Sequence, residues 1–288
     1  YSAEFERNRV LSRMLATEAE ALLARPVSEP SPLDLSVRKG MLTNGPEATA
    51  SLVFWEGTDA DDACRREMAR LARLDPLLER VRREGFSTEA AWFASADGYV
   101  RYVPNLPLVE ELPDDGYDLR EDVFFQIATP RRNPDHRTVW TPVYQDPAGQ
   151  GLMVTASTPV HGPDGEFRGV IGVDVTLDSI VERILARKEL VRGGGGASRD
   201  QFSFLVDSSG RLIAFPRGRL PALGIEPEAQ PEPGQTLEHS LLATDKPEVA
   251  RLIQRAATGE GPIASQLRID GDRHLMAMDR VPSTGWIL

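Results

Sequence analysis

Cysteine is nearly absent from this sequence, since Cys64 is the only one among 288 residues. A single cysteine excludes an intramolecular disulfide framework, a thiolate zinc site and Cys-x-x-Cys redox chemistry. Long apolar runs are missing too, because no stretch approaches the roughly 18 residues of a membrane-spanning helix. What remains has the composition of an ordinary folded domain, with 41% hydrophobic and 27% charged residues.

Basic residues are fewer than acidic ones. The chain has 33 Lys and Arg against 44 Asp and Glu, which gives a formal net charge of −11. Because no basic block is interleaved with aromatic residues, nucleic acid and anionic lipid are poor candidates for the main partner. Small cations and amines remain plausible partners.

The motifs of the common enzyme classes are missing as well. The sequence has no Gly-x-Ser-x-Gly, no His-Glu-x-x-His, no Gly-x-x-x-x-Gly-Lys and no EF-hand loop. Its four histidines are scattered, with no two at ligand spacing on one predicted element. We therefore expect no catalytic residues, no metal site and no cofactor.

Apolar spacing predicts helices first and strands later. Apolar residues at three- and four-residue steps predict a long amphipathic helix over Glu4–Ala24. Further along, a strand–turn–strand unit occurs twice, and in each copy a proline lies six residues after the turn glycine. The two pairs are Gly98 with Pro104 and Gly210 with Pro216. The repeat predicts an α+β fold with two related modules.

Asp174 is the most unusual residue of the predicted strands. It lies in an otherwise apolar strand, on the same face as Gly172, whose missing side chain leaves room beside the carboxylate. A buried carboxylate needs a cation or several hydrogen-bond donors. Two interpretations are open: Asp174 caps the helix that starts near Thr176 or binds neighbouring main-chain N–H groups, or it anchors the ammonium group of a ligand. The opposite, core face of the strand carries Ile171, Val173, Val175 and Leu177.

Asp146 is the second candidate. The run Asp146-Pro147-Ala148-Gly149 has the composition of a type I turn, which predicts a structural role for the aspartate. Its second carboxylate oxygen would still be available to a ligand. Four aromatic residues nearby in the sequence suit the wall of a site for a small organic cation, with core packing as the alternative for each. They are Phe124, Phe125, Trp140 and Tyr144.

Several strings in this region form a recognisable pattern. They are Phe124-Phe125, Trp140–Asp146, Val154–Val160 and Gly169–Val175. These strings resemble the membrane-distal module of double Cache sensor domains. The duplicated hairpin and the closing Pro282–Trp286 resemble the membrane-proximal module, so the resemblance covers essentially the whole chain.

The resemblance implies a long N-terminal helix and two PAS-like modules, each a central antiparallel sheet flanked by helices. The implied boundaries are residues 1–85 for the long helix and a helical segment, 86–190 for the membrane-distal module with the ligand pocket, and 191–288 for the membrane-proximal module. Such domains lie on the periplasmic or extracellular side of the cell inner membrane. We therefore expect transmembrane helices before Tyr1 and after Leu288, and a homodimer is compatible with the family.

The resemblance also bears on the ligand. In amino-acid-binding members, a motif resembling Arg-x-Trp-Tyr holds the ligand carboxylate, while Tyr and Asp residues hold the ammonium group. Tyr144, Asp146 and Asp174 match the ammonium half of that pattern.

The carboxylate half departs from the pattern. Asp122 stands at the Arg position and Phe124-Phe125 at the Trp-Tyr positions. An anion in place of a cation favours a ligand without a carboxylate, such as an amine. Three nearby arginines are candidates to replace the missing one: Arg120, Arg131 and Arg132.

The sequence thus predicts a non-enzymatic sensor domain of a transmembrane receptor, with a histidine kinase as the first expectation for the output and a chemoreceptor, cyclase or phosphatase as the others. Its predicted small-molecule site consists of Asp174, Asp146, Tyr144, Trp140, Phe124 and Phe125. Three alternatives remain open: a stand-alone solute-binding protein, a ligand-free module for dimerisation or protein contact, and a hydrolase that uses the two aspartates with a divalent metal.

Overall fold

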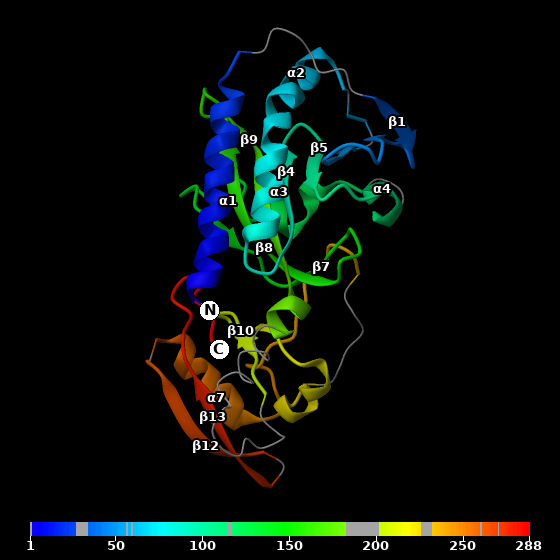
Figure 1. Cartoon of the computed structure of the whole chain (residues 1–288). Coiled ribbons are helices and arrows are strands. Elements are labelled where there is room, and N and C mark those ends of the chain that lie inside the picture. The colour runs from blue at the N-terminus through cyan, green and yellow to red at the C-terminus, as the bar shows by residue number, and fades with distance from the viewer. Residues whose placement is uncertain are drawn as a thin grey trace.

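The computed structural model describes residues 2–26, 34–55, 57–58, 60–113, 117–182, 202–225, 232–259, 261–269 and 271–288. They form two units, a larger one built on a broad sheet and a smaller one below it (Figure 1). The first and last described residues lie together at the junction, where the Ser2 hydroxyl donates to Ser283 Oγ at 3.2 Å. Within the described ranges, no helix has both the length and the apolar character needed to cross a bilayer.

The larger unit contains one nine-stranded antiparallel sheet, in the order β1-β2-β3-β5-β4-β9-β8-β6, with β7 paired to β8. Its helices are α1 (Ser2–Leu23), α2 (Asp62–Leu71), the 3-10 turn η1 (Ala72–Leu74), α3 (Asp75–Glu84), α4 (Leu108–Glu111), the 3-10 turn η2 (Leu119–Glu121) and α5 (Val123–Gln126). Its strands are β1 (Leu35–Arg38), β2 (Met41–Asn44), β3 (Ser51–Phe54), β4 (Thr88–Ser95), β5 (Tyr99–Val103), β6 (Val139–Trp140), β7 (Tyr144–Gln145), β8 (Leu152–His161) and β9 (Phe167–Thr176).

The sheet takes strands from both sides of the predicted boundary at residue 85. Strands β1 to β3 precede that boundary and pair, through β5, with strands that follow it. The short apolar run before Trp55 forms β3. The second predicted boundary, between residues 190 and 191, lies outside the described residues.

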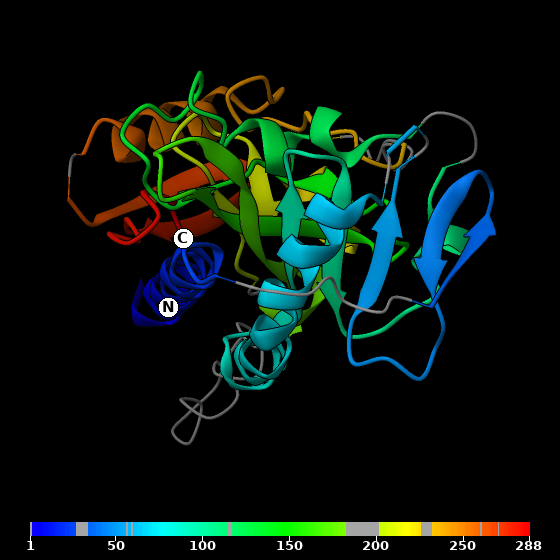
Figure 2. The same ribbon diagram turned by 90° about the horizontal axis from the view of Figure 1, so that it is seen from above.

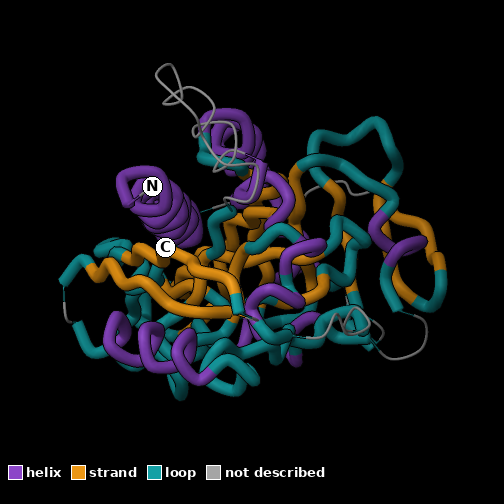
Figure 3. Tube along the Cα trace, turned by 90° about the horizontal axis from the view of Figure 1, so that it is seen from below, coloured by secondary structure: helices purple, strands orange, loops and turns teal. Residues whose placement is uncertain are grey.

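The two faces of the sheet have different coverings. Helices α1, α2 and α3 lie on one face (Figures 2 and 3), and they pack there on residues such as Phe93 and Ile171. Strand alternation turns the neighbouring residues, Trp92 and Val170, to the other face, which the short helices α4 and α5 cover. The face assignment predicted for β9 is therefore confirmed, since Val173 also lies in the helix-covered core.

Gly172 and Trp92 explain how the second face is built. The two residues are opposite each other in the β4–β9 pairing. A Cβ atom added to Gly172 would lie 2.0 Å from Trp92 Cζ2, so the indole ring lies directly over the glycine. The room that the sequence predicted beside Asp174 exists, but the Trp92 indole fills it.

The smaller unit contains two hairpins and a helix. The β10–β11 pair is the second copy of the duplicated hairpin, and antiparallel pairing confirms it. Helix α7 begins at a proline, a residue favoured in the first turn of helices, and buries Val249, Leu252 and Ile253. The elements are β10 (Leu205–Val206), β11 (Leu212–Ala214), the 3-10 turns η3 (Arg217–Arg219) and η4 (Pro221–Leu223), α7 (Pro247–Ala257), β12 (Ile263–Ile269) and β13 (Asp272–Met278).

A continuous hydrophobic core joins the two units. Phe5 of α1 packs its ring edge against Trp140 of the larger unit at 5.7 Å and against Trp286 of the smaller unit at 4.9 Å, measured between ring centroids. Val143 and Leu152 belong to the same cluster as the core of the smaller unit. The units are therefore held together by packed apolar side chains, which disfavours free movement of one against the other.

The Trp92–Gly172 contact predicts a specific sensitivity of the fold. We expect Gly172→Ala to destabilise the protein by about 1–3 kcal/mol, because the added methyl group overlaps the indole. Gly45→Ala is the matched control, since a Cβ there has nothing within 4 Å. The measurement is the free energy of unfolding in urea. Equal losses in the two variants would contradict the packing described here.

Candidate functional site

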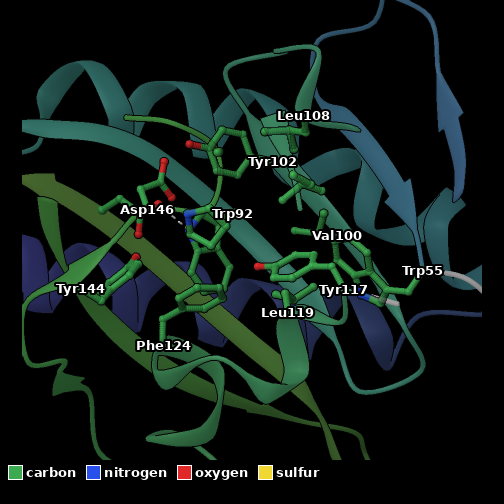
Figure 4. Close-up of a pocket in the computed structure, with 14 residues that line it drawn as sticks. Trp55, Trp92, Val100, Tyr102, Leu108, Tyr117, Leu119, Phe124, Tyr144 and Asp146 are labelled. Carbon is green, nitrogen blue, oxygen red and sulfur yellow. Dashed lines mark hydrogen bonds between the residues drawn. The ribbon is translucent and has the colours of Figure 1, made fainter. Parts of the chain in front are cut away.

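A cavity of about 50 Å³ lies on the sheet face opposite the long helices, between the strands and the short helices α4 and α5 (Figure 4). A volume of this size admits a few water molecules or a small ligand. Its wall is mostly aromatic and aliphatic, with two carboxyl groups. The lining residues are Trp55, Trp92, Val100, Tyr102, Leu108, Leu112, Tyr117, Leu119, Phe124, Tyr144, Asp146, Pro147, Ala148 and Asp174.

Asp174 is buried at the base of the cavity and is held by side chains. The indole N–H of Trp92 donates to Asp174 Oδ2 at 2.7 Å, and the Thr155 hydroxyl donates to Oδ1 at 2.8 Å. Thr155 in turn accepts from the Tyr144 hydroxyl at 2.7 Å. The two partners of Asp174 lie on β4 and β8, the strands on either side of β9, and neither is the main chain of a following helix. The helix-capping interpretation of Asp174 is therefore wrong.

Asp146 combines the turn role with a place in the cavity. The Gly149 N–H donates to Asp146 O at 3.2 Å, which closes the predicted turn, and the Gln150 N–H donates to Asp146 Oδ2 at 3.0 Å. The side chain nevertheless lines the cavity and is 6% exposed. The two interpretations given by the sequence are compatible because a carboxylate has more than one acceptor oxygen.

In the part of the chain that the structure describes, the two carboxyl groups have no cationic partner, and both have raised pKa values. Burial raises the pKa of Asp174 to about 8, and the charge of Asp146 adds to the effect, while the bonds from Thr155 and Trp92 oppose it. Burial raises the pKa of Asp146 to about 6, against the main-chain hydrogen bonds of Gln150 and Ala148. At neutral pH, Asp146 is thus ionised and Asp174 retains its proton. The cavity carries a net negative charge that no lining residue neutralises.

Tyr102 adds an unused polar atom to the same cavity. Its hydroxyl is buried and finds no hydrogen-bond partner among the described residues. Burial, with the charges of Asp174 and Asp146, raises its pKa well above the usual value, so the phenol stays protonated. Figure 4 shows this hydroxyl directed toward Asp146. An unpaired buried hydroxyl is costly in the empty protein and available to a ligand.

Tyr117 closes another part of the wall and connects it to Asp122. The Tyr117 hydroxyl donates to Asp122 Oδ2, and its ring packs edge-on against Trp55 with centroids 5.7 Å apart. Burial raises the pKa of Asp122 to about 6, the hydrogen bond from Tyr117 opposes this, and the charge of Asp146 contributes further. Asp122 therefore supports the wall of the cavity through its hydrogen bond with Tyr117.

The structure brings together four of the six predicted site residues: Asp174, Asp146, Tyr144 and Phe124 all line the cavity. Phe124 packs against Trp92 and against Tyr144, with centroids 5.3 Å apart in both pairs.

The other two predicted residues lie elsewhere, which corrects the expected aromatic wall. Phe125 is next to Phe124 on a helical turn and points away, packing against Phe167 with centroids 5.8 Å apart. Trp140, on the edge strand β6, packs against Phe5 and Trp286 at the junction of the two units. The aromatic wall is instead completed by residues that the sequence did not identify, namely Trp92, Tyr102, Tyr117 and Trp55.

None of the three arginines considered as substitutes lines the cavity. Arg120 pairs with Asp118 and donates to Ala96 O at 3.0 Å, so its guanidinium is already occupied. Arg131 and Arg132 are exposed. Among the described residues, no group of three or more His, Cys, Asp or Glu side chains is placed to hold a metal ion.

Sequence reasoning missed Trp92, Tyr102 and Thr155. One signal was present: Trp92 and Tyr102 lie on the two strands of the first hairpin and, by alternation, on one face of it. Their proximity to Asp174 depends on how that hairpin pairs with β9, which the sequence does not state.

The raised pKa of Asp174 predicts how the stability of the empty protein changes with pH. Because an unfolded aspartate titrates near 3.9 and the folded one near 8, the folded state binds more protons between these values. Stability therefore falls as pH rises from 5 to 8, by at most about 1.4 kcal/mol per pH unit from this group.

We expect Asp174→Asn to reduce this slope, while Asp135→Asn, an exposed control, leaves it unchanged. The measurement is thermal or urea unfolding at a series of pH values. A variant slope equal to that of the unsubstituted protein would contradict the assignment of the buried proton to Asp174.

The chain matches the Cache domain family over residues 13–288. The methyl-accepting chemotaxis protein McpA of Pseudomonas putida is 40% identical over 102 residues, which is 35% of this chain and 14% of that protein. The chain therefore matches only a small part of the length of this curated relative.

Solved structures show the same fold. The ligand-binding domain of the Pseudomonas aeruginosa amino acid chemoreceptor PctB, in complex with L-Arg, has a TM-score of 0.52 at 19% identity and covers 99% of this chain and 81% of that one. The extracellular domain of mmHK1S-Z3, a candidate histidine kinase, has a TM-score of 0.55 at 15% identity, with coverages of 99% and 86%. These likenesses confirm the predicted α+β fold. Together with the match over nearly the whole length, they show that this chain belongs to the Cache domain family.

Proposed function

We propose that this chain is the extracytoplasmic ligand-sensing domain of a transmembrane signalling receptor, and that its cavity binds a small organic cation without a carboxylate. One observation carries the choice of ligand: an aromatic cavity contains two buried carboxyl groups, Asp174 and Asp146, and none of the described residues that line it is basic. A bound cation would supply the counter-charge that the buried carboxylates lack.

The receptor role is supported by the family and by its relatives. McpA is a chemotaxis protein, PctB is an amino acid chemoreceptor, and mmHK1S-Z3 is a candidate histidine kinase. These relatives do not favour a stand-alone solute-binding protein or a ligand-free interaction module. The placement at the inner membrane, anchoring by flanking helices, a homodimer and the absence of catalysis in this domain are parts of the proposal.

A primary ammonium group fits the donors and acceptors of the cavity. Such a group carries three N–H donors, and the acceptors around the acidic end are the carboxyl groups of Asp174 and Asp146 and the hydroxyl oxygen of Tyr102. The surrounding aromatic rings favour a cation and also accommodate a short alkyl chain. A quaternary ammonium has no N–H and would leave the Tyr102 hydroxyl and the carboxylates without new hydrogen bonds.

A ligand carboxylate does not fit the same cavity. It would lie among apolar and aromatic side chains near two acids, and Arg120, one of the arginines considered as a substitute, is engaged by Asp118. Burial of an unpaired carboxylate costs several kcal/mol. We therefore expect amino acids to bind more weakly than the corresponding amines.

Binding of n-propylammonium, tetramethylammonium, L-alanine and propionate tests this assignment. We expect n-propylammonium to bind best, as measured by calorimetry and by the shift in melting temperature. Asp174→Asn should weaken it by about 30-fold or more, since removal of one partner of a buried charge pair costs 2–5 kcal/mol. Tyr102→Phe should weaken it about tenfold through the lost hydrogen bond to a charged group.

Asp135→Asn serves as the control for a lost exposed acid and should bind like the unsubstituted protein. Preferred binding of L-alanine or propionate, or n-propylammonium binding that survives Asp174→Asn, would refute the proposed ligand class.

The pH dependence of amine binding offers an independent check. Asp174 must lose its proton to pair with the ammonium group, and its pKa in the empty protein is about 8. The affinity for n-propylammonium should therefore rise between pH 6 and 8, by at most about tenfold per pH unit, since alkylamines stay protonated up to about pH 10. Calorimetry in two buffers of different ionisation enthalpy should detect the released proton. A constant affinity over this range would show that Asp174 does not exchange its proton for the cation.

A further inference from the structure

Residues 234–241, called here the linking segment, are hydrogen-bonded to both units of the protein. The first half pairs with β7 of the larger unit. The Gln145 N–H donates to Gln235 O at 2.9 Å, and the Leu237 N–H donates to Val143 O at 2.8 Å. These bonds flank an antiparallel bridge between Tyr144 and Thr236, so the segment extends the edge of the sheet that forms the cavity.

The second half of the linking segment pairs with the β10–β11 hairpin of the smaller unit. The Leu212 N–H donates to His239 O at 2.9 Å, and the Leu241 N–H donates to Gly210 O at 2.8 Å. Both Leu237 and Leu241 are buried in the core that includes this hairpin. The linking segment is thus joined by main-chain hydrogen bonds to a strand of each unit.

The linking segment pairs with β7, the strand that carries Tyr144 of the cavity wall. The Tyr144 side chain lines the cavity and joins Asp174 through Thr155, while the main chain of Tyr144 faces Thr236. Asp146 follows β7 directly. A ligand that draws the two carboxyl groups together therefore acts on both ends of β7.

A second contact reaches the linking segment from another wall of the cavity. Asp122, which accepts from the Tyr117 hydroxyl, lies against Gly234. A Cβ atom at Gly234 would be 2.5 Å from Asp122 Oδ1, and this glycine has a φ of +78°. Two lining residues, Tyr117 and Tyr144, are thus connected to the segment by independent contacts.

We propose that the linking segment transmits occupancy of the cavity to the β10–β11 hairpin of the smaller unit. The proposal rests on the proposed function, because it concerns the regulation that follows from a cation between Asp174 and Asp146. The ligand changes the position of β7, the paired first half of the segment moves with it, and the second half shifts the hairpin. By reciprocity, a disturbance of the segment changes the cavity.

The ligand-free arm of the test uses Gly234→Ala, which forces the segment away from Asp122. Amide hydrogen exchange, resolved by residue, reports the pairing with β7 at Gln145 and the pairing with the hairpin at Leu212 and Leu241. We expect exchange to be about fivefold faster or more at all three amides. Gly165→Ala is the matched control, since that glycine has a φ of +81° and its added Cβ meets nothing within 4 Å.

The ligand arm adds n-propylammonium. In the unsubstituted protein, exchange at Leu212 and Leu241 should slow when the ligand binds, while the amide of Ile253 in α7 serves as an internal reference. In Gly234→Ala the ligand should still bind, but the effect at the two hairpin amides should be lost. The double variant Asp122→Ala/Gly234→Ala relieves the forced contact and should recover part of the protection at Leu212 and Leu241.

The outcomes separate the coupling from the proposed function. If n-propylammonium does not bind, the proposed ligand class fails. The ligand-free arm then still tests whether Gly234→Ala speeds amide exchange at both ends of the linking segment. Faster exchange at Gln145 with unchanged Leu212 and Leu241 would overturn the proposal. So would a ligand effect on the hairpin that persists in Gly234→Ala, because transmission would then run through the shared core around Phe5.

Discussion

The structure of the larger unit depends on one buried carboxyl group, that of Asp174. A carboxyl at the centre of an antiparallel sheet, between apolar neighbours, must receive hydrogen bonds from adjacent strands. Trp92 and Thr155 supply them from the two strands that flank β9. The indole can reach the carboxyl only because Gly172, opposite Trp92, has no side chain. The positions of side chains on β4, β8 and β9 therefore depend on one another through this single carboxyl group.

The same acid supports the proposal that the cavity binds a cation. The hydrogen bonds to Asp174 are too few to offset its burial, and its pKa rises to about 8, so the empty site holds a proton where a ligand would place a cation. Asp146 lies in the same wall, and its main-chain turn fixes its position. In the proposed function, the cavity keeps acids for an ammonium group and has no basic residue in its described wall for a carboxylate.

The position of the cavity connects it to the rest of the molecule. Its wall includes β7, the strand that pairs with residues 234–237 of the smaller unit. On the opposite face of the sheet, α1 reaches the junction, where Phe5 packs between Trp140 and Trp286. Two contacts of different kinds, main-chain pairing and aromatic packing, therefore join the units. The first begins at the wall of the cavity, whereas the second lies apart from it.

The sequence by itself determined the local elements and the two acids. Alternation in β9 separated Asp174 from the core face, the Asp-Pro-x-Gly composition predicted the turn at Asp146, and the repeated hairpins indicated two modules. Only the tertiary structure decided which aromatic residues surround those acids. Trp92 lies 82 positions from Asp174 in the sequence, and Trp140, although near in sequence, lies at the junction instead. The physical reason is that strand register and the path of the chain around the sheet depend on long-range pairing, which local periodicity does not encode.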